Sequence, residues 1–141
     1  MLSAIVVAAG SSRRMGFDKL MAPLGGKNVL WHSLHVFGQM PEVTSLIVVT
    51  REDRMHEVDA VLKDAAPNKQ RLIVRGGEER YLSVWAGLQA LDVAVSEFVA
   101  IHDGARPLIT ASYRVPVRPT RVLYVESDPT LRGILASVLG D

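Results

Sequence analysis

The residues from Gly10 to Lys19 combine small side chains with basic ones, a combination suited to binding a phosphate. Between residues 10 and 30, four basic side chains stand against the carboxylate of Asp18, although the whole chain has a formal net charge of only +1. Backbone N–H groups in such a loop can surround an anion, while Arg14 and Lys19 add donors and positive charge. The loop matches neither a Walker A motif nor a GxGxxG fingerprint. We predict a phosphate-binding loop; the alternative is a solvated loop whose charge is incidental.

A second group of chemically capable residues lies between His102 and Pro107. Asp103 is expected at the carboxyl end of a buried strand, where a carboxylate that faces a phosphate loop is well placed to bind Mg²⁺. Arg106 would provide a further contact to an anion. The alternative is that Asp103 and Arg106 pair with each other and order the turn. His102 is interpreted as a packed or hydrogen-bonded histidine rather than as a ligand.

A third candidate is the pair Gly76 and Gly77, together with Ser83 at the start of the helix that follows. Two glycines let the backbone come close to a flat ligand such as a nucleobase. A tight turn between a strand and a helix explains the same residues without a ligand. Both interpretations stay open at the level of the residue types.

These three loops are expected to follow strands of one parallel sheet. Short apolar runs indicate strands buried on both faces, and helical patterns separate the first four of them at intervals of about 25 residues. The expected strands are residues 4–9, 46–50, 71–75, 98–101 and 121–125. This alternation predicts a three-layer, Rossmann-like, doubly wound α/β fold whose first four strands, numbered along the chain, lie in the order 3-2-1-4. The fifth strand is expected beside the fourth, with its helix over one face of the sheet.

Ligands bind such sheets outside the carboxyl ends of the strands, at the point where the strand order reverses. Here that point lies between the first and fourth strands. The loop of residues 10–19 and the turn of residues 102–107 should therefore flank one crevice.

Two polar residues are expected to cap helices that cover this sheet. Asn28 precedes a helical pattern, and Asp53 precedes another, and both residue types are good N-caps. Apolar residues recur at helical spacing after each of them. The expected buried faces are Leu30, Leu34 and Phe37 in the first helix, and Met55, Val58, Val61 and Leu62 in the second.

The composition limits the classes of protein that remain. The chain has 141 residues, with 16 Lys and Arg, 15 Asp and Glu, and no cysteine. The near balance of charge gives no reason to expect a nucleic acid or an anionic membrane as a partner. Without cysteine, disulfides, thiolate metal sites and thiol nucleophiles are excluded. The sequence contains no apolar run of membrane-spanning length and no secretory signal, so we expect a single cytoplasmic domain over residues 1–141.

Taken together, the three motifs resemble those of one enzyme family. The segment Ala8–Gly16, followed by Lys19 and residues 24–30, is similar to the signature of sugar-nucleotide-type nucleotidyltransferases. The later motifs, residues 76–88 and 102–107, narrow the resemblance to the 2-C-methyl-D-erythritol 4-phosphate cytidylyltransferase family of the non-mevalonate isoprenoid pathway. The resemblance is expected to cover residues 2–110.

The resemblance implies a reaction in which the phosphate of methylerythritol phosphate attacks the α-phosphate of CTP and releases pyrophosphate. Arg14 and Lys19 match the family's catalytic arginine and lysine, and Asp103 matches an aspartate associated with Mg²⁺. Arg106 matches a residue near the sugar-alcohol phosphate. The implied nucleotide-binding residues are Ala8, Ala9, Gly10, Ser11, Ser12, Gly76, Gly77 and Ser83.

The rest of the chain departs from the family pattern. Residues 111–120 are typical of a Pro-rich linker, and the family's dimerisation arm is not matched, so a homodimer stays an open expectation. Residues 121–141 resemble the first strand and helix of a response-regulator receiver domain, with Glu126 and Asp128 at its acidic pair. The alternative is a generic strand-and-helix unit that completes the sheet. Three hypotheses follow: a cytidylyltransferase, a nucleotide-binding fragment that holds CTP without turnover, or a chimera whose tail only completes the fold.

Overall fold

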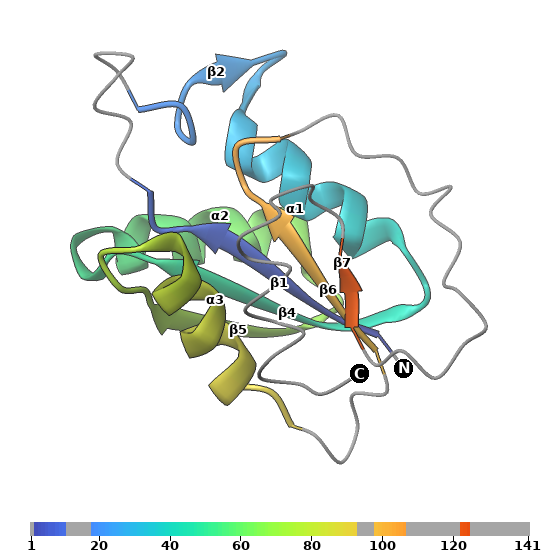
Figure 1. The fold of residues 1–141 in the computed structure, drawn as a ribbon. Coiled ribbons are helices and arrows are strands. Elements are labelled where there is room, and N and C mark those ends of the chain that lie inside the picture. Colours follow the sequence, from blue (N-terminus) through green and yellow to red (C-terminus); the bar gives the residue numbers. More distant parts are fainter. Residues whose placement is uncertain (1, 11–17, 93–97, 107–121, 125–141) are drawn as a thin grey trace.

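The computed structural model of the chain describes residues 2–10, 18–92, 98–106 and 122–124. Five strands in this part form one sheet in which every neighbouring pair is parallel (Figure 1). The strands are β1 (Leu2–Ala8), β4 (Val43–Thr50), β5 (Gln70–Arg75), β6 (Phe98–Asp103) and β7 (Val122–Tyr124). Their order, β5-β4-β1-β6-β7, confirms the predicted order of the first four strands and the place of the fifth beside the fourth.

Three α-helices in the described residues cover the two faces of this sheet. They are α1 (Val29–Gln39), α2 (Met55–Ala65) and α3 (Arg80–Gln89), and a 3₁₀ turn, η2 (Glu52–Arg54), precedes α2. None of the helices in the described segments is long and apolar enough to span a bilayer. The helix expected after residue 128 lies outside the described residues.

The sheet is buried on both faces because its strands are apolar at nearly every position. Every residue of β1 is buried. On one face, Val6 and Val48 pack in a cluster with Leu34 of α1 and Leu62 of α2. On the other face, a second cluster brings strand residues against α3, and the residues are Ile5, Val7, Ile47, Val49, Val84, Val99 and Ile101. This arrangement confirms the predicted three layers.

Close packing of α3 on the sheet requires a glycine. A Cβ on Gly87 would lie 2.7 Å from Cγ2 of Ile5 and 3.1 Å from Cγ2 of Val49. Such distances are shorter than side chains tolerate without displacement, so the glycine sets how near the helix sits to β1 and β4. The start of α3 is thereby brought to the carboxyl ends of these strands.

The two predicted helix caps have different outcomes. Asn28 caps α1 as expected, because its Oδ1 accepts a hydrogen bond of 2.8 Å from the backbone N–H of Trp31. The prediction for Asp53 was wrong. Its carboxylate pairs with Arg51 at 2.6 Å, and the 3₁₀ turn shifts the N-cap position of α2 to Arg54, which makes no side-chain capping bond.

A small antiparallel hairpin that the sequence patterns did not predict lies between β1 and α1. It consists of β2 (Pro23–Leu24) and β3 (Lys27–Asn28). Its turn is formed by Gly25 and Gly26, with φ of 60° and 88°, a conformation that favours glycine. The strands are too short for an alternating pattern to be visible in the sequence.

Candidate functional site

The carboxyl ends of β1, β4 and β5 are joined by hydrogen bonds. The buried Thr50 hydroxyl donates to the carbonyl of Ala8 at 3.3 Å, which links β4 to the end of β1. The backbone N–H of Gly76 donates to the carbonyl of Thr50 at 2.8 Å, which links the loop after β5 to β4. The loops that follow these three strands therefore start from one connected edge.

Gly76 lies against two other residues that the sequence marked as nucleotide-binding. A Cβ at this position would come within 2.6 Å of the Ala9 Cβ and 2.7 Å of the Ser83 Oγ. Ser83 is buried, and its hydroxyl donates to the carbonyl of Gly77 at 3.4 Å. Ala9, Gly76, Gly77 and Ser83 thus form one uncharged corner, which we call the glycine corner. In this corner the backbone lies close to the strand ends, and Gly76 and Gly77 have no room for a larger side chain.

The turn after β6 is fastened to the neighbouring strand and helix. The N–H of Gly104 donates to the carbonyl of Val7 at 2.9 Å, and the buried Ser33 hydroxyl donates to the carbonyl of Gly104 at 2.8 Å. Asp103 Oδ1 accepts a bond of 2.9 Å from the N–H of Ala105. β6 runs through His102 to Asp103, two residues beyond the predicted end of the strand.

His102 supports this turn from inside the protein. Its ring is buried and packs edge-on against Phe37, with the ring centres 5.4 Å apart. Its Nε2 lies 2.8 Å from the carbonyl of Arg106, so Nε2 carries the hydrogen and donates it. Burial lowers the pKa of His102, which keeps the ring neutral. The interpretation of His102 as a packed, hydrogen-bonded residue is confirmed.

Asp103 faces two arginines rather than one. Its Oδ2 lies 4.0 Å from Nε of Arg106 and 3.8 Å from Nη1 of Arg80. The pairing of Asp103 with Arg106 that we considered as an alternative is thus present as a long contact. Arg80, at the start of α3, was not among the predicted site residues. The available signal was a basic residue three positions after Gly77, at the start of the helix. We call Asp103, Arg80 and Arg106 the charged turn.

The oxygen atoms of Asp103 fit a metal ion only if a bound ligand completes its coordination. No group of three or more His, Asp or Glu side chains able to hold a metal ion occurs within the described segments of the chain. Asp103 Oδ1 accepts a bond from a backbone N–H, and among the described residues Oδ2 has only the two long contacts with Arg80 and Arg106. Mg²⁺ often binds to one or two carboxylates and completes its shell with substrate phosphates and water. The residues fit a cation brought in with a polyphosphate.

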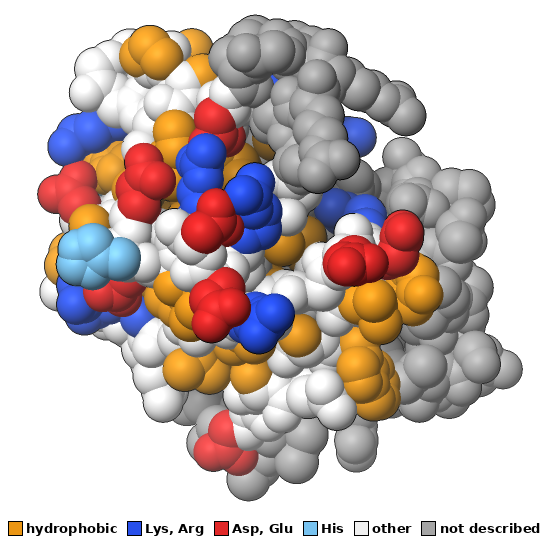
Figure 2. Space-filling view, turned by 90° about the vertical axis from the view of Figure 1, so that its left-hand side faces the viewer, with side chains coloured by type: hydrophobic (Ala, Val, Ile, Leu, Met, Phe, Trp, Pro, Cys, Tyr) orange, Lys and Arg blue, Asp and Glu red, His pale blue; other side chains and the backbone are white. Residues whose placement is uncertain are grey.

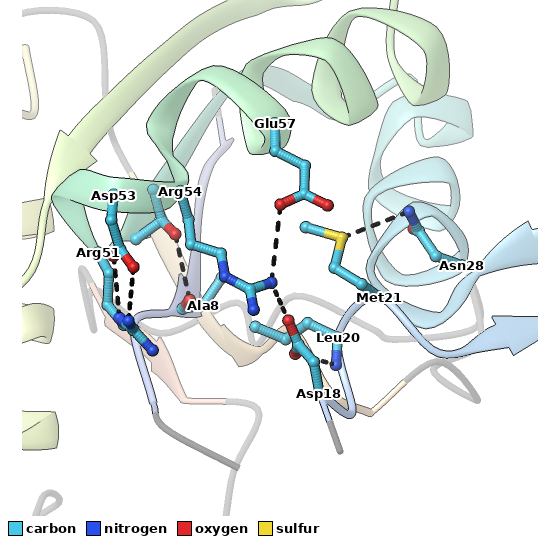
Figure 3. Close-up of polar contacts among 10 residues, drawn as sticks. Ala8, Asp18, Leu20, Met21, Asn28, Arg51, Asp53, Arg54 and Glu57 are labelled. Atoms are coloured by element: carbon cyan, nitrogen blue, oxygen red, sulfur yellow. Dashed lines mark hydrogen bonds and ion pairs between the residues drawn. The ribbon is translucent and has the colours of Figure 1, made fainter.

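The glycine-serine-arginine loop is described only at its two ends. Ala8, Ala9 and Gly10 begin it, Asp18 and Lys19 close it, and Ser11, Ser12 and Arg14 lie outside the described residues. The side chain of Lys19 is exposed. Figure 3 shows the carboxylate of Asp18 paired with the guanidinium of Arg54, a residue that the sequence patterns did not single out.

The carboxyl side of the sheet carries mixed charge. Figure 2 views the molecule from the side toward which the arrowhead of β1 points in Figure 1, and basic and acidic side chains are interspersed there among the residues drawn in colour. Ion pairs such as Arg54 with Asp18 and Arg75 with Glu52 belong to this mixture. A mixed surface suits a small charged substrate better than an extended polyanion.

The sequence of the chain matches one known protein family. The family described as IspD: 2-C-methyl-D-erythritol 4-phosphate cytidylyltransferase matches residues 2–127. The chain belongs to this family. The match continues past residue 110, where the sequence resemblance was expected to end, and includes the linker and β7. The receiver-like segment of residues 121–141 stays a prediction.

Relatives in the IspD family match this chain over about half of their own length. The enzyme named 2-C-methyl-D-erythritol 4-phosphate cytidylyltransferase from Dehalococcoides mccartyi strain 195 is 45% identical over 109 residues, which are 77% of this chain and 47% of the relative. The protein of the same name from Caldanaerobacter subterraneus is 43% identical over 112 residues, 77% of this chain and 49% of the relative. The chain spans about half the length of the curated relatives it matches.

A solved structure agrees with the fold. The crystal structure of 4-diphosphocytidyl-2C-methyl-D-erythritol synthase from Anaerococcus prevotii is 34% identical and superposes with a TM-score of 0.67. The similarity covers 78% of this chain and 46% of that chain. The likeness to the IspD family therefore includes the α/β fold with its parallel sheet.

Proposed function

We propose that the chain is a nucleotidyltransferase that transfers CMP from CTP to 2-C-methyl-D-erythritol 4-phosphate and releases pyrophosphate. The observation that carries the proposal is the meeting of the three family motifs at one sheet edge. Ala9 lies against Gly76, and the N–H of Gly104 is bonded to the carbonyl of Val7 one residue before Ala8. An edge of this kind at the reversal of strand order is a common place for a nucleotide.

The glycine corner is the proposed site of the cytosine. Gly76 and Gly77 would present backbone groups to the base, and Ser83 would hold the loop in shape from beneath. The other proposed nucleotide-binding residues continue the loop after β1, and they are Ala8, Ala9, Gly10, Ser11 and Ser12. Close approach of backbone to a flat base requires that no side chain intervene, which is what the two glycines provide.

The charged groups are proposed to bind the phosphates. Arg14 and Lys19 would contact the triphosphate of CTP and stabilise negative charge on the α-phosphate as its bond to pyrophosphate breaks. Arg106, whose side chain is 63% exposed, is proposed to contact the phosphate of the sugar alcohol. These roles need no covalent nucleophile, because the attacking atom is an oxygen of the second substrate. The protein's contribution is position and fixed positive charge.

Asp103 is proposed to hold Mg²⁺ together with the triphosphate. Such a cation, when bound, neutralises phosphate charge and helps to align the reacting groups. Arg80 would then remain close to Asp103 and add positive charge next to the phosphates.

The proposed partners are two small phosphate esters. The near-neutral charge of the chain supports neither a nucleic acid nor an anionic membrane as partner. We propose action in the cytoplasm, and a homodimer is testable by light scattering on the purified chain. We further propose that residues 1–141 form one α/β unit, with residues 111–120 as a linker within it.

As a second candidate function we propose a module that binds CTP without completing the transfer. This alternative uses the same glycine corner and the same loop cations. It differs only in the absence of product.

A pyrophosphate-release assay with CTP, Mg²⁺ and methylerythritol phosphate tests the proposal. We expect turnover that Lys19→Ala lowers by about a hundredfold or more, since loss of one transition-state charge contact commonly has this effect. Calorimetric binding of CTP without any product would favour the binding module. Absence of both turnover and CTP binding would refute both functions.

A further inference from the structure

Lys19 lies between two residues whose positions are fixed. On its carboxyl side, Leu20 is 7% exposed, and its carbonyl accepts a bond of 2.9 Å from the N–H of Leu30 at the start of α1. On its amino side, Asp18 is held by its own carboxylate. Oδ1 accepts a bond of 3.1 Å from the N–H of Leu20, and the other oxygen pairs with Arg54.

Arg54 comes from a distant part of the chain and is itself oriented. It stands at the junction of η2 and α2, where its N–H donates to the carbonyl of Arg51 at 3.0 Å. Its guanidinium reaches between Glu57, at 3.7 Å, and Asp18 (Figure 3). The side chains of Arg54 and Asp18 are only 28% and 26% exposed, so solvent screens this pair less than the outer pairs.

From this geometry we infer that Arg54 is a positioning residue for Lys19, acting through Asp18. The inference rests on the proposed function, because it takes Lys19 to be the cation that meets the triphosphate. Arg54 fastens the end of the loop to the start of α2, and Asp18 passes that constraint to the backbone on both sides of Lys19. A lysine has a long flexible side chain, so a fixed backbone narrows the region that its ammonium group can reach.

Two simpler roles for Arg54 make different predictions. If the ion pair only stabilises the fold, its loss lowers the unfolding temperature and leaves ligand binding alone. If Arg54 touches the triphosphate directly, its loss weakens binding whether or not Lys19 is present. If Arg54 acts through Lys19, its substitution changes the affinity for CTP only in a protein that still has Lys19.

A double-mutant cycle on CTP affinity, measured by calorimetry with the full chain, separates these roles. We expect Arg54→Gln and Asp18→Asn each to weaken CTP binding about tenfold, and to weaken it less than about twofold further in a Lys19→Ala background. Arg51→Gln is the matched control, since it removes an arginine three positions away that pairs with Asp53 outside the loop. Its CTP affinity should stay at the native value.

A second measurement tests the contact between Arg54 and Asp18 in the absence of any ligand. Hydrogen exchange at the Leu20 amide, which donates to Asp18, should become faster in Arg54→Gln and stay unchanged in Arg51→Gln. The inference is overturned if the Leu20 amide does not respond. It is also overturned if Arg54→Gln weakens CTP binding equally with and without Lys19, or if it leaves binding unchanged. Neither measurement needs turnover, so a chain that binds CTP without product would refute the transferase proposal alone.

Discussion

The glycine corner and the charged turn lie at the same edge of the sheet, but their side chains interact differently. In the glycine corner the contacts are uncharged, such as the 2.8 Å bond between Gly76 and Thr50 and the close packing of Gly76 on Ala9 and Ser83. In the charged turn the backbone is also fixed by bonds of 2.8–2.9 Å, but the Asp103 carboxylate lies 3.8–4.0 Å from two partly exposed arginines. Close packing resists displacement, whereas loose ion pairs give way readily to a ligand.

This difference suggests a division of labour within one site. A packed corner is suited to recognising a rigid group by shape, because its own geometry is fixed before the ligand arrives. A loosely paired turn is suited to phosphates and a cation, because its charges can exchange partners at small cost. Substitutions that disturb packing in the first region should therefore lower stability, and substitutions of the charged side chains in the second should mainly lower turnover.

The largest effect is expected from Asp103→Asn. The amide can still accept the bond from Ala105, but the negative charge proposed to hold Mg²⁺ is lost. We expect turnover in the pyrophosphate assay to fall about a hundredfold, with a change of less than about 1 kcal/mol in the free energy of unfolding. A large loss of stability without loss of turnover would contradict the proposed division.

The converse result is expected from Gly76→Val. The new side chain would meet Ala9 and Ser83 at distances near 2.6–2.7 Å, so the loop after β5 must move. Overpacking of this kind lowers the free energy of unfolding by about 1–3 kcal/mol, which urea denaturation measures, and CTP binding should weaken with it. Gly10→Ala is the control for stability, because a Cβ there has no neighbour within 4 Å among the described residues. An unfolding free energy equal for the two variants would show that the corner is not tightly packed.

The smallest effect concerns the buried support of the charged turn. Burial lowers the pKa of His102 below the usual 6.5, so the unfolded chain binds a proton at pH values where the folded chain does not. The stability that the neutral ring contributes is therefore complete above pH 6.5 and is lost as the pH falls toward the lowered pKa.

We expect the unfolding free energy of the native chain to fall below that pH by at most about 1.4 kcal/mol per pH unit from this group, and His102→Gln to remove this part of the slope. Denaturant titrations at several pH values measure it. His56→Gln, which removes an exposed histidine from α2, controls for the loss of one histidine. A slope that is the same in all three proteins would show that His102 does not couple folding to pH.

The sequence was most informative where a local pattern and the global fold agree. Asn28 caps α1 because a cap needs only its own helix, and the strand order follows from apolar runs joined by helical crossovers. The prediction for Asp53 failed because Arg51, two residues earlier, binds its carboxylate. Arg51 is visible in the sequence as a neighbour of Asp53, but the sequence does not show that its guanidinium reaches the carboxylate.

Contacts between distant segments could not be predicted from residue types. Nothing in the sequence pairs Asp18 with Arg54, or Arg80 with Asp103, since each pair is created by how the loops after different strands are folded together. The same holds for the Ser33 hydroxyl of α1, which donates to the carbonyl of Gly104. The catalytic and binding roles assigned to Arg14, Lys19 and Asp103 stay predictions.

The central position of β1 has a consequence for how the protein is made. β1 pairs on one side with β4 and on the other with β6, which are both synthesised after it, and Val7 lies opposite Asp103. Contacts so distant along the chain require a large loop to close and form slowly. Until the segment around residue 103 has been synthesised, the N-terminal strand has an unpaired, apolar edge that other chains can bind. The candidate site therefore forms when β6 pairs with β1 and covers this edge.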